Sequence, residues 1–205
     1  MPARLRPHPE GLGPVHAAAP YAGPLREALV AFKDHGRWTL RAPLGDLLGR
    51  AAAAAVLGAP VPRLALVPVP SSLDASRERD GDHVRELARR AARSLRRAGL
   101  DVAVVGALWP PRHRHDQVGL GRTARAANLA GTLLPTSRAA SLRDAGTAVL
   151  LVDDLVTTGS TLAEAARALG TMGVVPLGAA VVAATRMPAV GVPTGPITTA
   201  AAPGG

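Results

Sequence analysis

Four stretches of the chain are almost entirely apolar, and the segments between them place apolar residues at helical spacing. The apolar runs lie at residues 63–70, 101–108, 147–152 and 174–185. Each is predicted to form a buried strand. Helices are predicted at residues 21–36, 43–58, 81–99 and 160–173, with a further one from near Gly121. The third of these opens with Asp82 as a plausible N-cap and closes at Gly99 as a C′ residue.

Strands that are apolar along their whole length and alternate with helices are typical of a parallel sheet covered on both faces. The predicted fold class is therefore α/β, with a mostly parallel central sheet flanked by helices. In such sheets, ligands bind beyond the carboxyl ends of the strands. Three loops leave those ends, after Pro70, Leu108 and Val152, and all three carry unusual residues.

The organisation predicted from composition is a single domain between two loose ends. Residues 1–20 are rich in Pro, Gly and Ala without a period, and they are predicted to form a flexible arm. Residues 21–186 hold the predicted strands and helices, and 205 residues suffice for one ordinary core. Residues 187–205 have the composition of a disordered tail.

Composition then narrows the chemistry. The chain has no cysteine, which excludes disulfides, thiolate nucleophiles and cysteine-based zinc sites. No apolar run is long enough to cross a bilayer and the N-terminus lacks a signal-peptide core, so a cytoplasmic protein is expected. The formal charge is +9, but Lys33 is the only lysine and the arginine excess resembles the codon bias of a GC-rich genome. Net charge by itself therefore says little about whether the protein binds nucleic acid, a membrane or a polyphosphate ligand.

The loop after Val152 carries the most specific chemistry. Asp153 and Asp154 are adjacent carboxylates that require a cation or hydroxyl donors, and ribose hydroxyls with a bound Mg²⁺ meet that need. Small and hydroxyl-bearing residues follow: Thr157, Thr158, Gly159, Ser160 and Thr161. Gly159 permits a positive φ, and the helix start offers N–H groups and a favourable dipole to a phosphate. The turn thus matches ribose 5-phosphate, although Ser160 or Thr161 acting only as a helix cap also fits the pattern.

The run "VLLVDDLVTTGST" resembles the phosphoribosyl-pyrophosphate (PRPP) motif of type I phosphoribosyltransferases, and residues 21–186 resemble the ComF-like branch of that family. The segment "YAGPLREALVAFKDHGR" resembles the family's N-terminal helix with its K-x-x-G end. Gln117, Leu120, Arg125 and Asn128 match the spacing of a Q-x-x-L…R-x-x-N signature. Two features depart from the family: the cysteine-based zinc finger is absent, and "RDGDH" stands where R-G-F-N-Q is usual.

The resemblance implies roles for two further loops. It implies that Ser71, Ser72, Arg77 and Arg79 bind pyrophosphate, although a solvated loop also fits those arginines. It implies a flexible loop that closes over PRPP and excludes water, carrying Arg112, His113, Arg114, His115, Gln117, Arg122 and Arg125. Arg112 and Arg114 would neutralise the departing pyrophosphate, and His113 or His115 would act as acid or base.

The function expected from the resemblance is Mg²⁺-dependent transfer of phosphoribose from PRPP to an unidentified nitrogenous acceptor, with Asp153 and Asp154 holding the ribose hydroxyls directly or through Mg²⁺. The acceptor would be chosen by a small helical hood at residues 21–57. The alternative is a non-catalytic PRPP-responsive accessory protein in DNA uptake or handling, for which the arginine-rich helix 84–97 would contact a polyanion. Aromatic stacking platforms are nearly absent, which counts against single-strand recognition. The sequence neither predicts nor excludes a homodimer.

Overall fold

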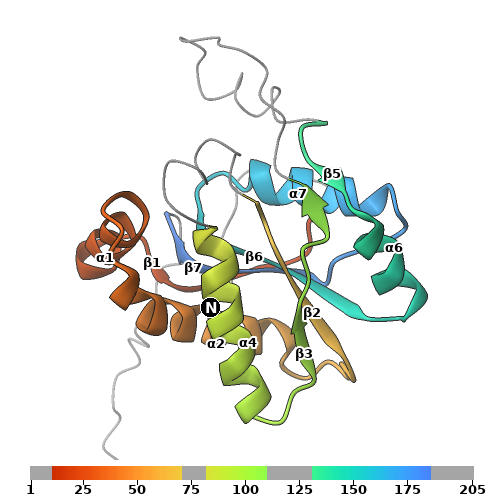
Figure 1. Cartoon of the computed structure of the whole chain (residues 1–205), viewed down its shortest axis with the longest axis horizontal. Coiled ribbons are helices and arrows are strands. Elements are labelled where there is room, and N and C mark those ends of the chain that lie inside the picture. Colours follow the sequence, from red (N-terminus) through yellow and green to blue (C-terminus); the bar gives the residue numbers. More distant parts are fainter. Residues whose placement is uncertain (1–10, 71–81, 110–130, 186–205) are drawn as a thin grey trace, which may run out of the picture.

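The fold is a parallel sheet with helices on both faces, seen in a computed structural model that describes residues 11–70, 82–109 and 131–185. Within these residues, five parallel strands are arranged in the order β1-β7-β6-β2-β3 (Figure 1). The strands are β1 (Val15–Pro20), β2 (Leu64–Pro68), β3 (Val102–Val104), β6 (Ala148–Val156) and β7 (Gly178–Ala184). The predicted α/β class and parallel sheet are confirmed.

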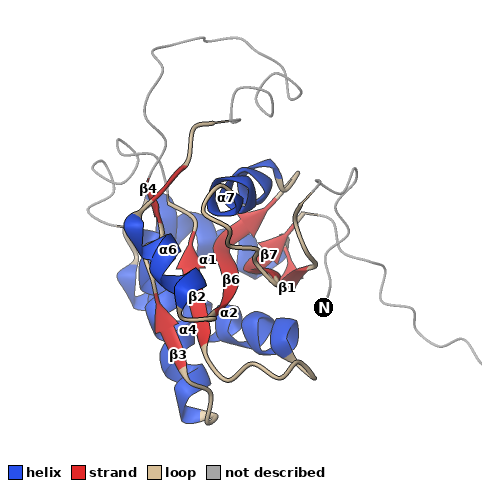
Figure 2. Cartoon of the chain, turned by 90° about the vertical axis from the view of Figure 1, so that its right-hand side faces the viewer, coloured by secondary structure: helices blue, strands red, loops and turns tan. Residues whose placement is uncertain are grey.

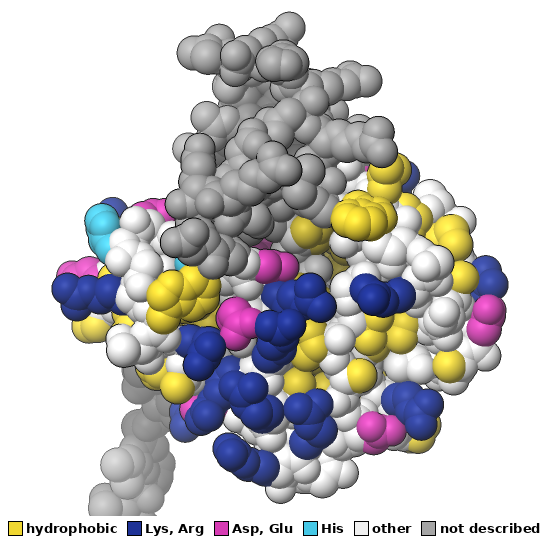
Figure 3. Space-filling view, in the orientation of Figure 1, with side chains coloured by type: hydrophobic (Ala, Val, Ile, Leu, Met, Phe, Trp, Pro, Cys, Tyr) yellow, Lys and Arg dark blue, Asp and Glu magenta, His cyan; other side chains and the backbone are white. Residues whose placement is uncertain are grey.

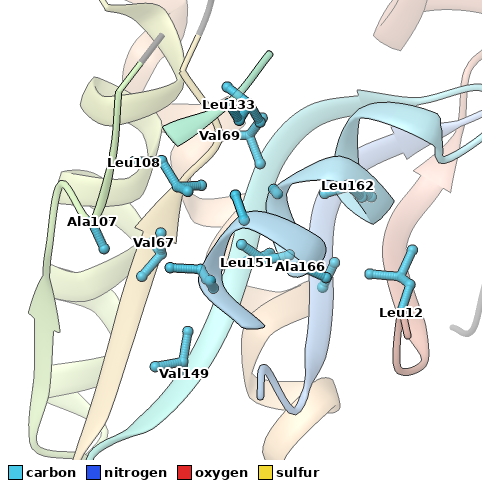
Figure 4. Close-up of a cluster of buried hydrophobic side chains, with 14 of the residues drawn as sticks. Leu12, Val67, Val69, Ala107, Leu108, Leu133, Val149, Leu151, Leu162 and Ala166 are labelled. Atoms are coloured by element: carbon cyan, nitrogen blue, oxygen red, sulfur yellow. The ribbon is translucent and has the colours of Figure 1, made fainter. Parts of the chain in front are cut away.

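Helices cover both faces because successive strand residues point to opposite sides of a sheet. In β6, Leu150 and Val152 face one hydrophobic cluster, whereas Val149 and Leu151 face another. The first cluster is shared with α1 (Gly23–Asp34), α2 (Arg41–Val56) and α4 (His83–Arg97). The second is shared with α6 (Ser137–Asp144) and α7 (Ser160–Gly170). Figure 2 shows helices on either side of the strands, and Figure 4 shows Leu162 and Ala166 of α7 packed toward the sheet.

The prediction of a flexible arm over residues 1–20 is wrong for residues 15–20. Residues 15–20 form strand β1, an edge strand that pairs along β7 from Val15 opposite Ala179 to Pro20 opposite Ala184. The segment has few residues with high strand propensity, so its own sequence carries no strand signal. Contacts with β7 bring it into the sheet, and residues 1–10 and 187–205 lie outside the described part of the chain.

The predicted strand at residues 101–108 is divided in two. β3 ends at Val104, and β4 (Leu108–Trp109) leaves the sheet to pair antiparallel with β5 (Leu134–Pro135). Helix α6 has no counterpart among the predicted elements, because its eight residues include only a short apolar face of Ala139 and Leu142. Its N-terminus is set by Thr136, whose hydroxyl accepts a hydrogen bond from the Arg138 N–H.

Helix α4 begins and ends as predicted from local signals. The Asp82 side chain accepts a hydrogen bond from the Arg85 N–H at 3.0 Å, and Gly99 follows the helix with φ of 90°. Its buried face packs on α2, where Gly45 lies so close to Arg90 that an added Cβ would meet the Arg90 Cβ at 2.5 Å. Asp46 accepts two hydrogen bonds from the Arg90 guanidinium, which is the main cause of its lowered pKa.

The two parts of the predicted hood, residues 21–57, lie in different places on the sheet. α2 packs against α4, β7 and β1, so it covers the sheet. α1 starts directly after the carboxyl end of β1 and is joined to α2 by the short helix η1 (Trp38–Leu40). Only the α1–η1 portion therefore lies at the edge of the sheet where ligands bind. No helix in the described ranges is both long and apolar enough to span a membrane.

Candidate functional site

The candidate site is the connection between β6 and α7, at the carboxyl end of the middle strand of the sheet. β6 continues through both aspartates to Val156, beyond its predicted end at Val152. The chain then turns at Gly159, which has φ of 84° and ψ of 1° and is the N-cap residue of α7. Only glycine adopts this left-handed conformation without a steric penalty. The glycine thus sets the direction in which α7 leaves the strand.

The start of α7 combines backbone and hydroxyl donors. The helical hydrogen bonds begin with the Ala163 N–H donating to the Gly159 carbonyl at 2.9 Å, so the N–H groups of Ser160, Thr161 and Leu162 precede the ladder. The Thr158 hydroxyl lies 2.9 Å from the Ser160 hydroxyl and weakly accepts from the Ser160 N–H at 3.4 Å. Thr157, Thr158 and Thr161 are exposed. This arrangement suits an anion, and neither Ser160 nor Thr161 is the N-cap residue.

The two aspartates face opposite sides of β6. The sequence treats them as one pair, but neighbouring strand residues point in opposite directions. Asp154 is 3% exposed, and its Oδ2 lies 2.6 Å from the Nζ of Lys33 on α1. Asp153 is half-buried, and its Oδ1 accepts a hydrogen bond from the Asp154 N–H at 2.8 Å. As a whole residue, Asp153 is therefore more exposed than Asp154.

The pKa of Asp153 is raised well above its ordinary value. Removal of the carboxyl group from water is the largest cause, and the negative charge of Asp154 is the next. The Asp154 N–H and the Lys33 charge act in the opposite direction but do not cancel these effects. A carboxyl group that holds a proton this readily can both donate and accept hydrogen bonds, which suits a pair of vicinal hydroxyls.

Sequence reasoning missed a group of stacked side chains in the hydrophobic cluster that α1 shares with Val152 of β6. Trp38 stacks on His83 with ring centroids 4.7 Å apart and planes 5° apart, and Phe32 meets both rings edge-on. His83 is 3% exposed at the first turn of α4. A signal was present in the composition, because three of the four aromatic residues and the only lysine fall within residues 21–38. Because the chain has so few aromatic residues and a single lysine, their concentration in residues 21–38 indicates a role for this segment in packing or in the site.

The two other predicted loops lie outside the described residues, but their starting points are placed. Pro68 of β2 pairs with Val152 of β6, and the Val69 N–H donates to the Val152 carbonyl at 2.9 Å, so β2 ends beside the strand that continues into the aspartates. The roles of Ser71, Ser72, Arg77 and Arg79 stay predictions. So do those of Arg112, His113, Arg114, His115, Gln117, Arg122 and Arg125 in the segment 110–130.

The point where the chain returns from that second segment is anchored to α7. The Leu133 N–H donates to Glu164 Oε1 at 3.2 Å, and Glu164 is 5% exposed. The Arg167 guanidinium donates to both Glu164 oxygens, at 2.7 and 2.8 Å. This buried carboxylate therefore ties Leu133 to α7, the helix that begins at the Gly159 turn.

Comparison with known proteins agrees with this geometry. Residues 113–192 match the family model described as the phosphoribosyl transferase domain, which is less than half of the chain. The match includes β6, the turn at Gly159 and α7. It supports the type I phosphoribosyltransferase class, to which a mostly parallel sheet flanked by helices also corresponds. The search of curated proteins returned no match.

The predicted Mg²⁺ would reach Asp153 and Asp154 through ribose or water, and the side chains alone do not form a ready-made direct site for it. Mg²⁺ requires octahedral oxygen coordination, but one oxygen of Asp154 is already paired with Lys33. Across the described ranges, no group of three or more His, Asp or Glu side chains could hold a metal ion. The site is thus suited to a sugar phosphate rather than to a free-standing cation.

Proposed function

We propose that the protein binds PRPP at the β6–α7 turn and transfers its phosphoribosyl group to a nitrogenous acceptor with release of pyrophosphate. The observation that carries this proposal is the junction itself, where Asp153 with its raised pKa precedes the donor-rich N-terminus of α7. The first end suits ribose hydroxyls and the second suits the 5-phosphate. The phosphoribosyl transferase domain match over this segment supports the same conclusion.

In this reaction, the bond between ribose C1 and the diphosphate oxygen breaks, and its electron pair leaves with the diphosphate. The lone pair of the acceptor nitrogen forms the new bond to C1, and the nitrogen then loses its proton to solvent. The α7 N–H groups and the hydroxyls of Thr158 and Ser160 would hold the phosphate. Asp153 would orient the ribose hydroxyls by donating and accepting hydrogen bonds. Mg²⁺ would arrive as part of the substrate, bound to the diphosphate.

The finer assignment to the ComF-like branch rests on the sequence segments that resemble it. The K-x-x-G end falls at Lys33 and Gly36, and Lys33 is the residue that reaches Asp154. A role in nucleotide metabolism or in competence stays a prediction, and assembly into a homodimer stays a hypothesis. The acceptor is not identified. The following experiments test PRPP binding and DNA binding separately.

Titration calorimetry with PRPP and Mg²⁺ tests the proposal directly. Wild-type protein should bind PRPP, and Asp153→Asn should weaken binding by about tenfold, because leaving a buried hydrogen-bond partner unsatisfied costs about 1–3 kcal/mol. Asp144→Asn removes a carboxylate that is exposed on α6 and should leave the affinity unchanged. If wild-type protein does not bind PRPP, or if Asp153→Asn binds it equally well, the assignment of this site is incorrect.

A second candidate function is contact with nucleic acid, which a row of arginines on α4 favours. Arg85, Arg89, Arg93 and Arg97 recur every four residues and are exposed, and Figure 3 shows cationic side chains gathered over this helix. Three arginines of the predicted polyanion-binding helix 84–97 already have partners within the protein, since Arg90 binds Asp46, Arg96 donates to the Val102 carbonyl at 2.7 Å and Arg89 of the exposed row pairs with Glu86. The four exposed arginines therefore form a smaller candidate nucleic-acid surface than the whole of helix 84–97, which the sequence predicted.

Substitution of the four row arginines by glutamine should remove salt-dependent DNA binding measured by fluorescence anisotropy. The physical reason is that each arginine bound to a phosphate releases condensed counterions, so the salt dependence of binding decreases with each arginine that is replaced. A matched variant with Arg26, Arg37, Arg63 and Arg143 changed to glutamine loses the same charge from other exposed positions and should bind as wild type does. No retention of DNA by wild-type protein at low salt would exclude this function.

A further inference from the structure

The ion pair between Lys33 and Asp154 joins two elements that are distant in the sequence at the centre of the candidate site. The Lys33 Nζ lies 2.6 Å from the Asp154 Oδ2. The side chain of Asp154 is 4% exposed and that of Lys33 is 31% exposed, so the carboxylate is enclosed while the lysine stem remains in contact with solvent. An enclosed carboxylate requires a compensating charge. In this structure that charge comes from α1.

The choice of lysine at this position is informative. The chain has 24 lysines and arginines together, and Lys33 is the only lysine among them. An ammonium group is a compact point charge that can approach a single carboxylate oxygen, whereas a guanidinium is a planar fork suited to two oxygens at once. A chain that uses arginine everywhere else therefore has a compact cation where β6 ends.

A divalent metal is the usual alternative partner for two neighbouring carboxylates. Here that position is already taken, because one oxygen of Asp154 is paired with Lys33 and Asp153 Oδ1 accepts the Asp154 N–H. Lys33 already supplies positive charge to Asp154 at contact distance. The acidic pair with Lys33 carries less negative charge than two bare aspartates would, which weakens its attraction for a metal and its repulsion of a phosphorylated ligand.

We propose that Lys33 is the resident counter-cation of the acidic pair, and that it keeps this turn free of divalent metal until a phosphorylated ligand brings one. The ammonium of Lys33 occupies the electrostatic role that Mg²⁺ would otherwise have at Asp154. Lys33 is thus a positioning residue, which acts on the ligand through Asp154. The link to catalysis rests on the proposed function, but the effect on the metal can be measured without PRPP.

The test uses the full-length ligand-free protein and Mg²⁺ or Mn²⁺ alone. Thermal unfolding of wild-type protein should not respond to millimolar Mg²⁺, because its acidic pair is already compensated. Lys33→Met should gain a metal-dependent rise of several degrees in its midpoint, reversed by a chelator, because a ligand that binds only the folded state stabilises it. Lys33→Arg keeps the charge and should not respond. Arg63→Met removes a cation from an exposed pair with Asp101 and should not respond either.

A metal response of wild-type protein as large as that of Lys33→Met would overturn the proposal. So would a folded Lys33→Met protein, verified by circular dichroism, that shows no metal response. If Lys33→Met does not fold, Lys33→Gln gives the same comparison, because it keeps a hydrogen-bond donor toward Asp154 without the charge. PRPP calorimetry on wild-type protein tests the proposed function separately, so either idea can fail alone.

Discussion

Replacing Gly178 with alanine is expected to lower the free energy of unfolding by about 3 kcal/mol, as is typical of severe overpacking. Gly178 opens β7 with φ of 151°, and a Cβ at this position would lie 2.2 Å from the Pro14 carbonyl oxygen. That carbonyl accepts the hydrogen bond from the Ala179 N–H at 2.9 Å, so it cannot move away without breaking the pairing of β1 with β7. Urea unfolding followed by circular dichroism measures the effect.

Gly170→Ala is the matched control for this change. Gly170 is the last residue of α7, and a Cβ there would meet no atom within 4 Å. Its substitution should change the stability by no more than about 0.5 kcal/mol. If Gly178→Ala were as stable as Gly170→Ala, the close approach of β1 to β7 would not exist in solution. Because β1 leads directly into α1, loss of this approach would also disturb the position of Lys33.

Replacing Gly159 with valine is expected to weaken binding of ribose 5-phosphate by about 100-fold, because a strained backbone conformation costs about 1–3 kcal/mol. The glycine has φ of 84°, and a β-branched residue strongly resists this conformation. The turn would relax toward negative φ, and the N–H groups of Ser160, Thr161 and Leu162 would no longer converge on one anion. Titration calorimetry with ribose 5-phosphate measures the loss.

Gly146→Val separates the loss of binding from general strain. Gly146 also has a positive φ, of 58°, with no atom within 4 Å of an added Cβ, but it lies before β6, at the opposite end of the strand from the aspartates. This variant should lose stability through the same backbone strain and keep its affinity for ribose 5-phosphate. Equal affinities of the two variants would show that the turn at Gly159 does not bind the phosphate.

Much of the central part of the fold could be predicted because its signals are local. The apolar run around Leu66 and the run around Leu150 indicate buried strands, since each residue needs an apolar neighbour on both faces of the sheet. Asp82 and Gly99 mark the ends of α4 through interactions with its own backbone. The turn at Gly159 belongs to the same class, since its glycine, hydroxyls and helix start are consecutive in the chain.

Elements that depend on distant partners could not be predicted in this way. β1 is a strand because β7 lies beside it, and the residues around Ala17 carry little preference of their own. β4 leaves the sheet because β5 pairs with it after a long intervening segment. The place of α2 on the sheet could not be predicted, because periodicity shows that a helix has an apolar face but not which surface that face covers.

The sequence by itself determined the chemistry of the candidate site: two carboxylates, a glycine and several hydroxyls at the end of a buried strand, in an order that resembles a ribose-phosphate motif. Only the tertiary structure decided which of the two aspartates is enclosed and which residue compensates its charge. It encloses Asp154 against Lys33, raises the pKa of Asp153, and packs Phe32 and Trp38 into the hydrophobic cluster that covers Val152 of β6. The reason is that strand alternation and the docking of α1 bring together charges that are far apart in the chain, and burial makes their interaction strong.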